Sequence, residues 1–460
     1  MSLLIDNTVC SSLHFTGIFG SGMSAIAQYC RWQGLAVSGS DRLGDNAAET
    51  ADVRGKLEAI GCRLFPQDGS GVVPRTSAVV VSTAIEQSNP DVAAARLRAI
   101  PVFHRSDVLA AIVGLKKTIA VAGTSGKSSV AAMIFHILHH AGRRPSLIAG
   151  ANLHDLVRRG YIGNAFSDAS PLLVIEADES DGSLVKYRPS ISVFLNISKD
   201  HKPVDETMGM FRTLAAQSSV VIANGDEPLF DGLNACERFG CTAVAGFSAD
   251  MAWDAASATV MRNGRKYRVP FPGKHMADNL CAALCVCAHL GVDEDTMAAA
   301  ALTYRGLQRR FDRIATKRGV TVIDDYAHNP EKIRAALLAA QSLSARVTAL
   351  FQPHGFGPLR FMFDELVAAF AATLRASDTL VLLPIYYAGG TVEKDVSSKD
   401  IAARLRAGCA ATVIAPDSRD EAPVVVARLA HSGDVVILMG ARDPSLPLFA
   451  GRLAAAIDGL

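Results

Sequence analysis

Short apolar runs alternate with stretches of helical spacing along the whole chain. The run at 118–122 leads through a glycine-rich turn into a helical pattern from 130 to 140. An apolar run bounded by turn residues is typical of a buried strand, so this order indicates a strand–turn–helix unit. Comparable apolar runs occur at 36–41, 78–82, 101–103, 172–175, 191–197, 220–224, 320–323, 347–351, 379–383 and 434–440, and further helical patterns at 280–290 and 331–340. The alternation predicts parallel sheets covered by helices, an α/β fold.

The length of the chain predicts several domains of this kind. At 460 residues it corresponds to about three domains of ordinary size. A boundary is expected near 113, just before the apolar run at 118–122, and another near 313. We therefore expect a Rossmann-like domain over 1–113, a central parallel sheet over 114–313, and a second Rossmann-like α/β domain over 314–460.

Composition and charge narrow the class of protein. Hydrophobic residues make up 49% of the chain, charged residues make up 20%, and the formal net charge is +1. A balanced charge provides no electrostatic footprint for nucleic acid, and no apolar run approaches the roughly 18 residues of a membrane span. Asp6 without a preceding basic region argues against a signal peptide, and an odd count of nine cysteines argues against a disulfide framework. We therefore expect a cytoplasmic protein with no membrane insertion and no nucleic-acid partner.

The turn after the run at 118–122 has the spacing of a phosphate-binding loop. Backbone N–H groups at a helix start favour an anion, a lysine adds positive charge, and a serine hydroxyl suits Mg²⁺. Val121 occupies a position where the complete motif has glycine. The candidate nucleotide residues are Gly123, Thr124, Ser125, Gly126, Lys127, Ser128 and Ser129. The central domain is therefore expected to be P-loop ATPase-like; the alternative is a plain strand-to-helix turn with a surface lysine.

Four carboxylates follow the run at 172–175, within 176–181. They would repel one another unless something cationic lay between them. The carboxyl ends of parallel strands share one edge of a sheet, so these residues are expected beside the phosphate loop. Mg²⁺ bound by one or two carboxylates and by phosphate oxygens is the expected occupant. The alternative for these carboxylates is a solvated acidic loop. His201, after the run at 191–197, is expected at the same edge as a metal or phosphate ligand; the alternative is an ordinary surface or core histidine.

The first domain carries a second glycine-rich turn. Its spacing is G-x-x-G-x-G, which differs from the dinucleotide-binding pattern and is by itself a weak signal. The next apolar run ends in an acidic residue about 20 positions on, a placement that suits a ribose or phosphate neighbour. The candidate residues are Gly17, Gly20, Ser21, Gly22, Met23, Ser40 and Asp41. A Rossmann-like domain that serves only as a scaffold is the alternative.

Taken together, these motifs resemble those of the Mur ligases, ATP-dependent enzymes that add amino acids to UDP-N-acetylmuramoyl precursors of peptidoglycan. The resemblance extends over essentially the whole chain, and the alanine-adding branch of the family is the nearest match. The segments that carry it are 14–17, 22–24, 37–41, 176–181, 324–330 and 351–354. It implies that ATP phosphorylates a substrate carboxylate to an acyl phosphate, which an incoming amine then attacks. The protein would contribute positioning and charge neutralisation.

The resemblance also implies roles for the phosphate loop and its neighbours. Lys127 would hold the β- and γ-phosphates of ATP. Ser128 and Glu176 would share one Mg²⁺, and His201 would serve a second metal position. Lys127, Glu176 and His201 are therefore the candidate catalytic residues.

By the same resemblance, the remaining candidates would bind the other parts of the substrates. His275 and Asn279 would frame the adenine, Arg310 would contact a phosphate, and Asp325 the ribose. The glycine turn of the first domain would hold the UDP part of a UDP-linked sugar acid. The candidate residues for the amine substrate, an amino acid or a peptide, are His328, His354 and Arg360. Sites shared between domains imply closure on substrate binding, and the chain is expected to act as a monomer or homodimer.

The chain departs from the family pattern at several of these positions. Ser125 replaces the usual histidine of the loop, Ser128 a threonine, and Met276 an asparagine. Gly355 and Pro358 stand where the alanine-adding enzymes carry arginines expected to grip the carboxylate of the amino acid. Loss of such a pair removes on the order of 1.5–3 kcal/mol. We therefore hypothesise that the amine is not simply free L-alanine, or that it is gripped differently.

Alternatives remain within and outside this class. The leading interpretation is a ligase that joins L-alanine or a related amine to UDP-N-acetylmuramate. A muropeptide-recycling ligase that adds a peptide, or a Mur-like ligase of another pathway, is the alternative within the class. A non-catalytic nucleotide-binding regulator is the alternative outside it, and the retained Lys127 and Glu176 argue against that. A nicotinamide dehydrogenase leaves the phosphate loop of the second domain unexplained.

Overall fold

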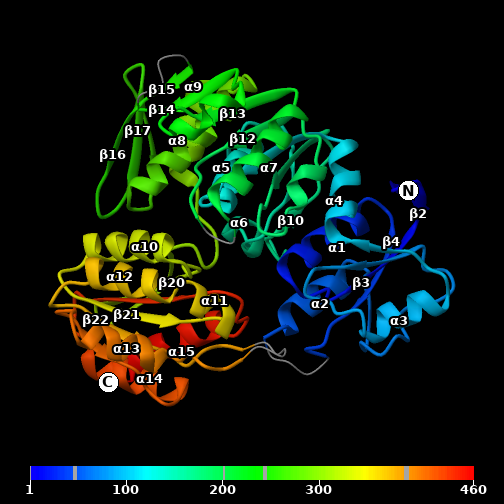
Figure 1. Ribbon diagram of the computed structural model, residues 1–460. Helices are drawn as coiled ribbons and strands as arrows, with labels where there is room; N and C mark the ends of the chain where they lie inside the picture. Colours follow the sequence, from blue (N-terminus) through cyan, green and yellow to red (C-terminus); the bar gives the residue numbers. More distant parts are fainter. Residues whose placement is uncertain (1, 45–48, 200–201, 242–245, 388–392, 460) are drawn as a thin grey trace. The chain divides into compact units, whose positions relative to one another are not determined.

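The computed structural model describes residues 2–44, 49–199, 202–241, 246–387 and 393–459. Within them, three larger sheets are accompanied by helices, and the expected α/β fold class is confirmed (Figure 1). Two smaller sheets are present: the hairpin of β1 (Leu3–Ile5) and β2 (Thr8–Cys10), and a sheet of β16 (Asp250–Trp253), β17 (Ala258–Arg262) and β18 (Arg265–Val269). No helix of the described ranges is both long and apolar enough to cross a membrane.

The first sheet has five parallel strands in the order β5-β4-β3-β6-β7. The strands are β3 (Ser12–Thr16), β4 (Ala36–Ser40), β5 (Arg63–Phe65), β6 (Ala78–Val81) and β7 (Val102–His104). The helices are α1 (Ser21–Trp32), α2 (Ala51–Ala59), α3 (Pro90–Leu97) and α4 (Arg105–Gly114). Because β3 is central, the glycine turn that follows it lies at the carboxyl end of the middle strand, where α/β sheets bind ligands.

The central sheet is organised around β8 (Lys117–Ala122), which lies between β11 and β12 in the order β10-β9-β11-β8-β12-β13-β14-β15. Its other strands are β9 (Ser146–Ile148), β10 (Ala165–Phe166), β11 (Leu172–Glu176), β12 (Ile191–Phe194), β13 (Val220–Asn224), β14 (Glu237–Gly240) and β15 (Gly246–Ser248). Its helices are α5 (Lys127–His140), α6 (His154–Arg158), α7 (Val204–Ala216), α8 (Lys274–His289) and α9 (Glu294–Thr303), with 3-10 turns at Ser183–Lys186 and Pro228–Leu233. β8 pairs in parallel with both neighbours, so the ends of β8, β11 and β12 meet at one edge.

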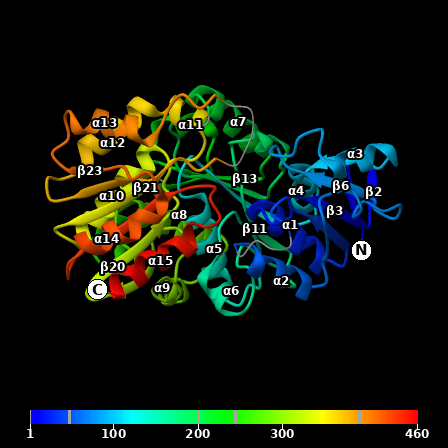
Figure 2. The same cartoon turned by 90° about the horizontal axis from the view of Figure 1, so that it is seen from below.

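The C-terminal sheet has the order β19-β20-β24-β21-β22-β23, with only β19 antiparallel to its neighbour. Its strands are β19 (Asp312–Lys317), β20 (Val320–Asp325), β21 (Val347–Gln352), β22 (Thr379–Leu382), β23 (Thr412–Ile414) and β24 (Val435–Gly440). The helices are α10 (Pro330–Leu343), α11 (Phe356–Phe361), α12 (Phe363–Thr373), α13 (Ser398–Arg406), α14 (Ala422–Leu429) and α15 (Leu446–Asp458), with a 3-10 turn at Arg419–Glu421. Two apolar clusters result, because α10, α12 and α13 cover one face of the sheet and α14 and α15 the other (Figures 1 and 2).

The chain divides into two compact units. An N-terminal unit contains Met1–Ala252, Thr259–Val269 and Ala277–Gly306, and a C-terminal unit contains Trp253–Ala258, Pro270–Met276 and Leu307–Leu460. The N-terminal unit therefore holds both the first and the central sheet. The two sheets are linked by the buried Asn164, which accepts a hydrogen bond from Nε2 of Gln28 at 2.9 Å and donates to the carbonyl oxygen of Ser21 at 2.7 Å. The domain boundaries near 113 and 313 stay predictions.

Candidate active site

The phosphate loop connects β8 to α5, and two of its glycines adopt conformations that other residues rarely take. Gly126 precedes α5 with a φ of 86°, and Gly123 has a φ of 147°. A Cβ atom at position 126 would also clash with Oδ1 of Asn279. Asn279, in α8, therefore lies directly against the loop, as expected for a residue of the nucleotide site.

Asn196 holds the loop from the neighbouring strand end. Its Oδ1 accepts the backbone N–H of Ser125 at 2.9 Å, and its Nδ2 donates to the carbonyl oxygen of Ser125 at 3.0 Å. The hydroxyl of Thr124 donates to the carbonyl oxygen of Ser198 at 3.2 Å. Sequence reasoning missed Asn196, although its place near the end of the apolar run at 191–197 was the available signal. These bonds fix the conformation of the loop between β8 and α5.

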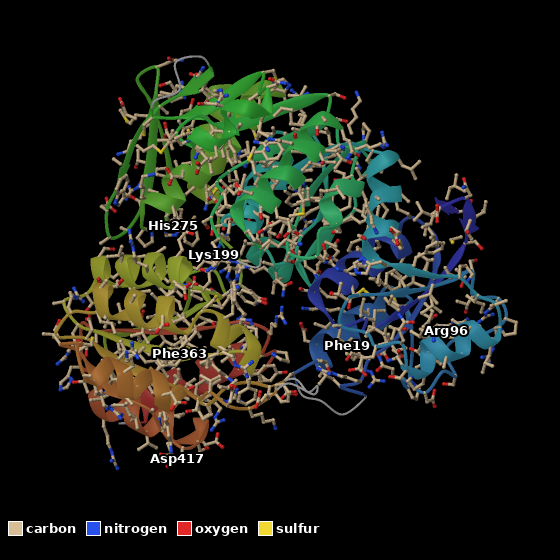
Figure 3. The ribbon with its side chains drawn as sticks, in the orientation of Figure 1. Phe19, Arg96, Lys199, His275, Phe363 and Asp417 are labelled. Carbon is tan, nitrogen blue, oxygen red and sulfur yellow. The ribbon has the colours of Figure 1, made fainter. Side chains whose placement is uncertain are left out.

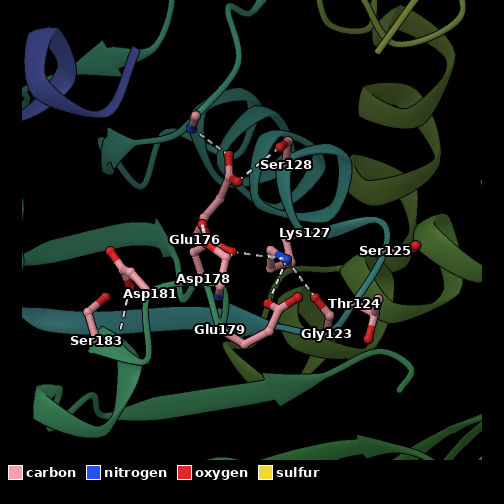
Figure 4. A network of polar contacts seen from close by, with 12 residues as sticks. Gly123, Thr124, Ser125, Lys127, Ser128, Glu176, Asp178, Glu179, Asp181 and Ser183 are labelled. Carbon is pink, nitrogen blue, oxygen red and sulfur yellow. Dashed lines mark hydrogen bonds and ion pairs between the residues drawn. The ribbon is translucent and has the colours of Figure 1, made fainter. Parts of the chain in front are cut away.

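The side chain of Lys127 is 13% exposed at the loop and faces three oxygen acceptors (Figure 4). Its Nζ donates to the carbonyl oxygen of Gly123 at 2.8 Å and to Oε2 of Glu179 at 2.7 Å, and lies 3.5 Å from Oδ1 of Asp178. Burial alone would lower the pKa of Lys127, but the charges of Asp178 and Glu179 outweigh burial and raise that pKa. Lys127 is therefore a charged ammonium at the loop.

The four carboxylates in 176–181 avoid repulsion because they have separate partners. Asp181 forms an ion pair with Arg105 at the start of α4, with Oδ2 and Nη2 2.6 Å apart. Burial would raise the pKa of Asp178, but the charge of Lys127 and hydrogen bonds from Ser180 outweigh it and lower that pKa. The pKa of Glu179 is raised, chiefly by burial, despite its contact with Lys127. The expected cation between these groups is thus supplied in part by the chain itself.

Glu176 and Ser128 come together at the start of α5, as expected. The Ser128 hydroxyl donates to Oε2 of Glu176 at 2.9 Å, and the backbone N–H of Gly150 donates to Oε1 at 2.6 Å. Hydroxyl and carboxylate oxygens are the ligand types that Mg²⁺ takes beside phosphates, so this pair fits that ion. His201 lies outside the described residues. Among the residues that are described, no group of three or more His, Cys, Asp or Glu side chains is arranged to hold a metal.

The glycine turn of the first domain is held by the end of β4. The N–H groups of Gly17 and Ile18 donate to the carbonyl oxygen of Ser40 at 2.8 and 3.0 Å, and Phe19 N–H donates to Oδ2 of Asp41 at 3.1 Å. Asp41 therefore stabilises the turn itself, beyond the ligand contact expected of it. The other candidates lie where α1 begins: Gly20 precedes the helix, and Ser21, Gly22 and Met23 form its first turn.

A buried carboxylate, Asp91, supports this turn from α3 and was missed by sequence reasoning. Its Oδ2 contacts Nε2 of His14 at 3.2 Å, the hydroxyl of Thr16 at 3.1 Å and the hydroxyl of Ser40, and its Oδ1 accepts the N–H of Gly69 at 3.0 Å. Burial would raise the pKa of Asp91, but the hydrogen bonds from His14, Ser40 and Thr16 and the charge of His14 outweigh burial and lower that pKa. The Ser40 hydroxyl thus donates to Asp91, while the Ser40 carbonyl oxygen accepts hydrogen bonds from the turn.

We predict that Asp91→Asn destabilises the protein and reduces its sensitivity to acid. A buried acceptor of several hydrogen bonds is replaced by an amide that presents N–H groups to donors, which costs about 1–3 kcal/mol. Because folding lowers the pKa of Asp91, the stabilisation from its charge is complete above the ordinary pKa and disappears as the pH falls through the folded value. Urea unfolding between about pH 3 and pH 7 measures both effects.

The matched control for this prediction is Asp52→Asn, because Asp52 forms an exposed ion pair with Lys56 on α2. The free energy of unfolding of that variant is expected to lie within about 0.5 kcal/mol of the value for the parent protein. Equal stability of Asp91→Asn and the parent at neutral pH would contradict a supporting role for Asp91.

In the C-terminal unit, Asp325 is held at the end of β20. Its Oδ2 accepts the N–H of Phe311 at 2.6 Å and its Oδ1 the N–H of Ala327 at 2.7 Å. The pKa of Asp325 is raised, chiefly by burial. Burial lowers the pKa of His275, although the negative charge of Asp325 acts in the opposite direction. His275, labelled in Figure 3, lies in the first turn of α8 and belongs to this unit. The guanidinium of Arg310 lies over the Tyr326 ring, 4.5 Å from its centroid. His275, Arg310 and Asp325 are thus gathered around one strand end.

An ion pair beside Asp325 was missed by sequence reasoning. Nε of Arg309 lies 3.2 Å from Oδ2 of the fully buried Asp324. Burial raises the pKa of Asp324 to about 6. No motif or spacing in the sequence indicated that Arg309 and Asp324 form a pair.

The three residues expected at the amine substrate do not form one cluster. His328 and His354 do come together, with ring centroids 5.3 Å apart at 74°, and Nδ1 of His328 donates to the carbonyl oxygen of Tyr326 at 2.9 Å. Arg360 is instead paired with Asp395, whose Oδ1 accepts from Nε at 3.1 Å. The charge of Arg360 is therefore already compensated within the protein.

Comparison with known proteins identifies the family. Models of three domains match the chain: "Mur ligase family, catalytic domain" over residues 12–117, "Mur ligase middle domain" over 121–287, and "Mur ligase, glutamate ligase domain" over 309–442. A UDP-N-acetylmuramate–L-alanine ligase from Arthrobacter sp. (strain FB24) is 38% identical over 417 residues, which cover 86% of this chain and 86% of the relative.

Solved structures share the fold. The crystal structure of a UDP-N-acetylmuramate–alanine ligase from Thermotoga maritima aligns with a TM-score of 0.79 at 24% identity, covering 97% of this chain and 99% of that one. A murein peptide ligase from Psychrobacter arcticus aligns with a TM-score of 0.69 at 19% identity, covering 98% and 99%. The sequence matches and the three-domain architecture agree, and the chain belongs to the Mur ligase family of ATP-dependent, ADP-forming amide ligases.

Proposed function

We propose that this chain joins L-alanine or a related amine to the carboxylate of UDP-N-acetylmuramate, with conversion of ATP to ADP and phosphate, in peptidoglycan precursor synthesis. The observation that carries the proposal is the phosphate loop, where the partly buried Lys127 ammonium and the Ser128–Glu176 pair lie at the start of α5. The name of the relative that is 38% identical indicates the same pair of substrates.

The reaction proceeds in two steps. A carboxylate oxygen of the sugar acid attacks the γ-phosphorus of ATP, the bond to the β-phosphate oxygen breaks, and ADP leaves with the electron pair. The neutral amine then attacks the acyl carbon, and the tetrahedral intermediate expels phosphate and loses a proton to give the amide. Lys127 neutralises charge on the transferred phosphoryl group and orients it. Ser128 and Glu176 would hold Mg²⁺, which neutralises phosphate charge when bound.

The remaining assignments are part of the same proposal. Asn279 contributes to the adenine site from α8, and His275 does so from the start of that helix, while Arg310 contacts a phosphate and Asp325 the ribose. The turn at 17–23 binds the UDP part, and His201 serves a second metal position. The proposed domains are 1–113 for the UDP substrate, 114–313 for ATP and 314–460 for the amine and nucleotide contacts, in a monomer or homodimer acting in the cytoplasm.

A second candidate, addition of a peptide in muropeptide recycling, is favoured by the loop after His354. Gly355 and Pro358 provide no cation for the carboxylate of a small amino acid, and Arg360 is paired with Asp395. A peptide carries its carboxylate farther from the reacting amine, so it has less need of a cation here.

An ADP-release panel tests the proposal. UDP-N-acetylmuramate is combined with ATP, Mg²⁺ and, in separate reactions, L-alanine, other α-amino acids and an L-alanyl peptide. We expect ADP formation that requires both the sugar acid and one of these amines. Selective turnover with the peptide would establish the recycling activity instead. ATP binding without turnover in any combination would contradict the ligase and favour a regulator.

A further inference from the structure

Two loops of the C-terminal unit are fastened together beside His354. The backbone N–H of Gly355 donates to the carbonyl oxygen of Tyr386, and the N–H of Tyr386 donates to the carbonyl oxygen of Pro353, both at 2.8 Å. Gly355 has a φ of 73°, in the region that favours glycine, and α11 begins directly after it. The chain that follows His354 and the chain that follows β22 therefore form one local structure.

This structure contains a cation without a carboxylate partner. Lys394 Nζ lies 5.1 Å from the ring centroid of Tyr387 and 6.0 Å from that of Phe356. The two rings meet edge to face, with centroids 5.3 Å apart at 68°. Across the described part of the chain, Lys394 makes no ion pair, and the buried hydroxyl of Tyr387 has no hydrogen-bond partner.

The contrast with Arg360 shows which cation is available. Arg360 donates from Nε to Oδ1 of Asp395 at 3.1 Å and from Nη2 to the carbonyl oxygen of Glu393 at 3.1 Å. A substrate carboxylate would have to displace Asp395 to reach it. The Lys394 ammonium instead lies over two ring faces, a cation–π contact that a carboxylate supplements without displacing any anion.

We propose that Lys394 binds the carboxylate of an α-amino acid substrate at the His354 end of the C-terminal sheet. Phe356 and Tyr387 position its ammonium, which supplies the positive charge that pairs with that carboxylate. This inference rests on the proposed function and names the substrate class of the same site: amines with a free carboxylate next to the amino group. It explains how this chain could bind the carboxylate of an amino acid although Gly355 and Pro358 occupy the positions where the alanine-adding enzymes carry arginines.

The test compares an amino acid with its carboxamide, which lacks the negative charge. The α-amino acid with the highest turnover in the ADP-release panel is used, and KM and kcat are measured for both amines. The parent protein is expected to have a lower KM for the acid. In Lys394→Met, the KM for the acid should rise about tenfold or more while that for the carboxamide and for ATP stays unchanged. Lys394→Arg should retain most of the preference.

The control is Lys399→Met, because Lys399 pairs with Asp417 on the exposed start of α13 and should leave both KM values unchanged. An unchanged acid-over-amide ratio in Lys394→Met overturns the inference, and so does a parent protein that uses only a peptide. Loss of activity toward both amines alike would also overturn it, since that pattern indicates a structural role. By contrast, a parent protein that turns over no amine at all contradicts the proposed function itself.

Discussion

Lys127→Met is expected to lower kcat for ADP formation by at least about 10²–10³-fold, because it removes the positive charge that faces the transferred phosphoryl group. Methionine is unbranched like lysine and only one atom shorter, so the volume at the loop changes little. The ammonium is held at 2.8 Å from the Gly123 carbonyl oxygen and at 2.7 Å from Glu179, which places it before ATP arrives. Steady-state ADP release with the best amine measures the effect.

Stability has to be separated from chemistry in that experiment. The side chain of Glu179 is 6% exposed, so the single variant leaves a buried carboxylate without its cation, a change that costs on the order of 3 kcal/mol. Lys127→Met combined with Glu179→Gln removes this uncompensated charge and is expected to restore the unfolding midpoint but not turnover. Lys186→Met is the matched control, since Lys186 pairs with Asp107 on the surface of the same unit. Near-normal turnover in Lys127→Met would contradict the assignment of this loop to ATP chemistry.

The strands were predictable because each combines a short apolar run with a turn at its end. β13 covers Val220–Asn224, as expected, and β20 extends the expected run 320–323 to Asp325. Helix starts were less predictable: α5 begins at Lys127 and α8 at Lys274, ahead of the expected 130 and 280. Their first residues include polar side chains, Lys127, Ser128 and Ser129 in α5 and Lys274 and His275 in α8, so the apolar periodicity begins only later in each helix.

The site was predictable where its residues lie next to one another in the sequence or at strand ends. Glu176 reaches Ser128 because β11 pairs with β8 in parallel, so the two strand ends share an edge. Asp91 was not predictable, and the one signal for Asn196 was its place near the end of an apolar run. Each acts on a segment far away in the sequence, and only the order of strands in the folded sheets brings them together. The pairing of Arg360 with Asp395 was invisible for the same reason.

The local geometry at Gly126 provides the second large prediction. Gly126→Ala is expected to abolish ATP binding, because the added methyl group would clash with Oδ1 of Asn279 and would force the loop out of its conformation. Part of the cost is general: an alanine in the left-handed region costs about 1–2 kcal/mol at any position. The remainder is specific to the contact with Asn279, whose displacement would move the loop N–H groups away from a phosphate.

Gly142→Ala separates the two contributions. Gly142 follows the other end of α5 with a φ of 68°, so it carries the same general penalty, but a Cβ atom there would meet nothing within 4 Å. In urea unfolding, we expect both variants to lose a similar amount of stability. In equilibrium titration, we expect only Gly126→Ala to lose ATP affinity, by about tenfold or more for each 1.4 kcal/mol of specific strain. Equal ATP affinity in the two variants would mean that the loop tolerates a side chain at 126, and the phosphate would then have to bind elsewhere. Because both sites flank one helix, a difference between the variants reports on the loop and not on the stability of α5.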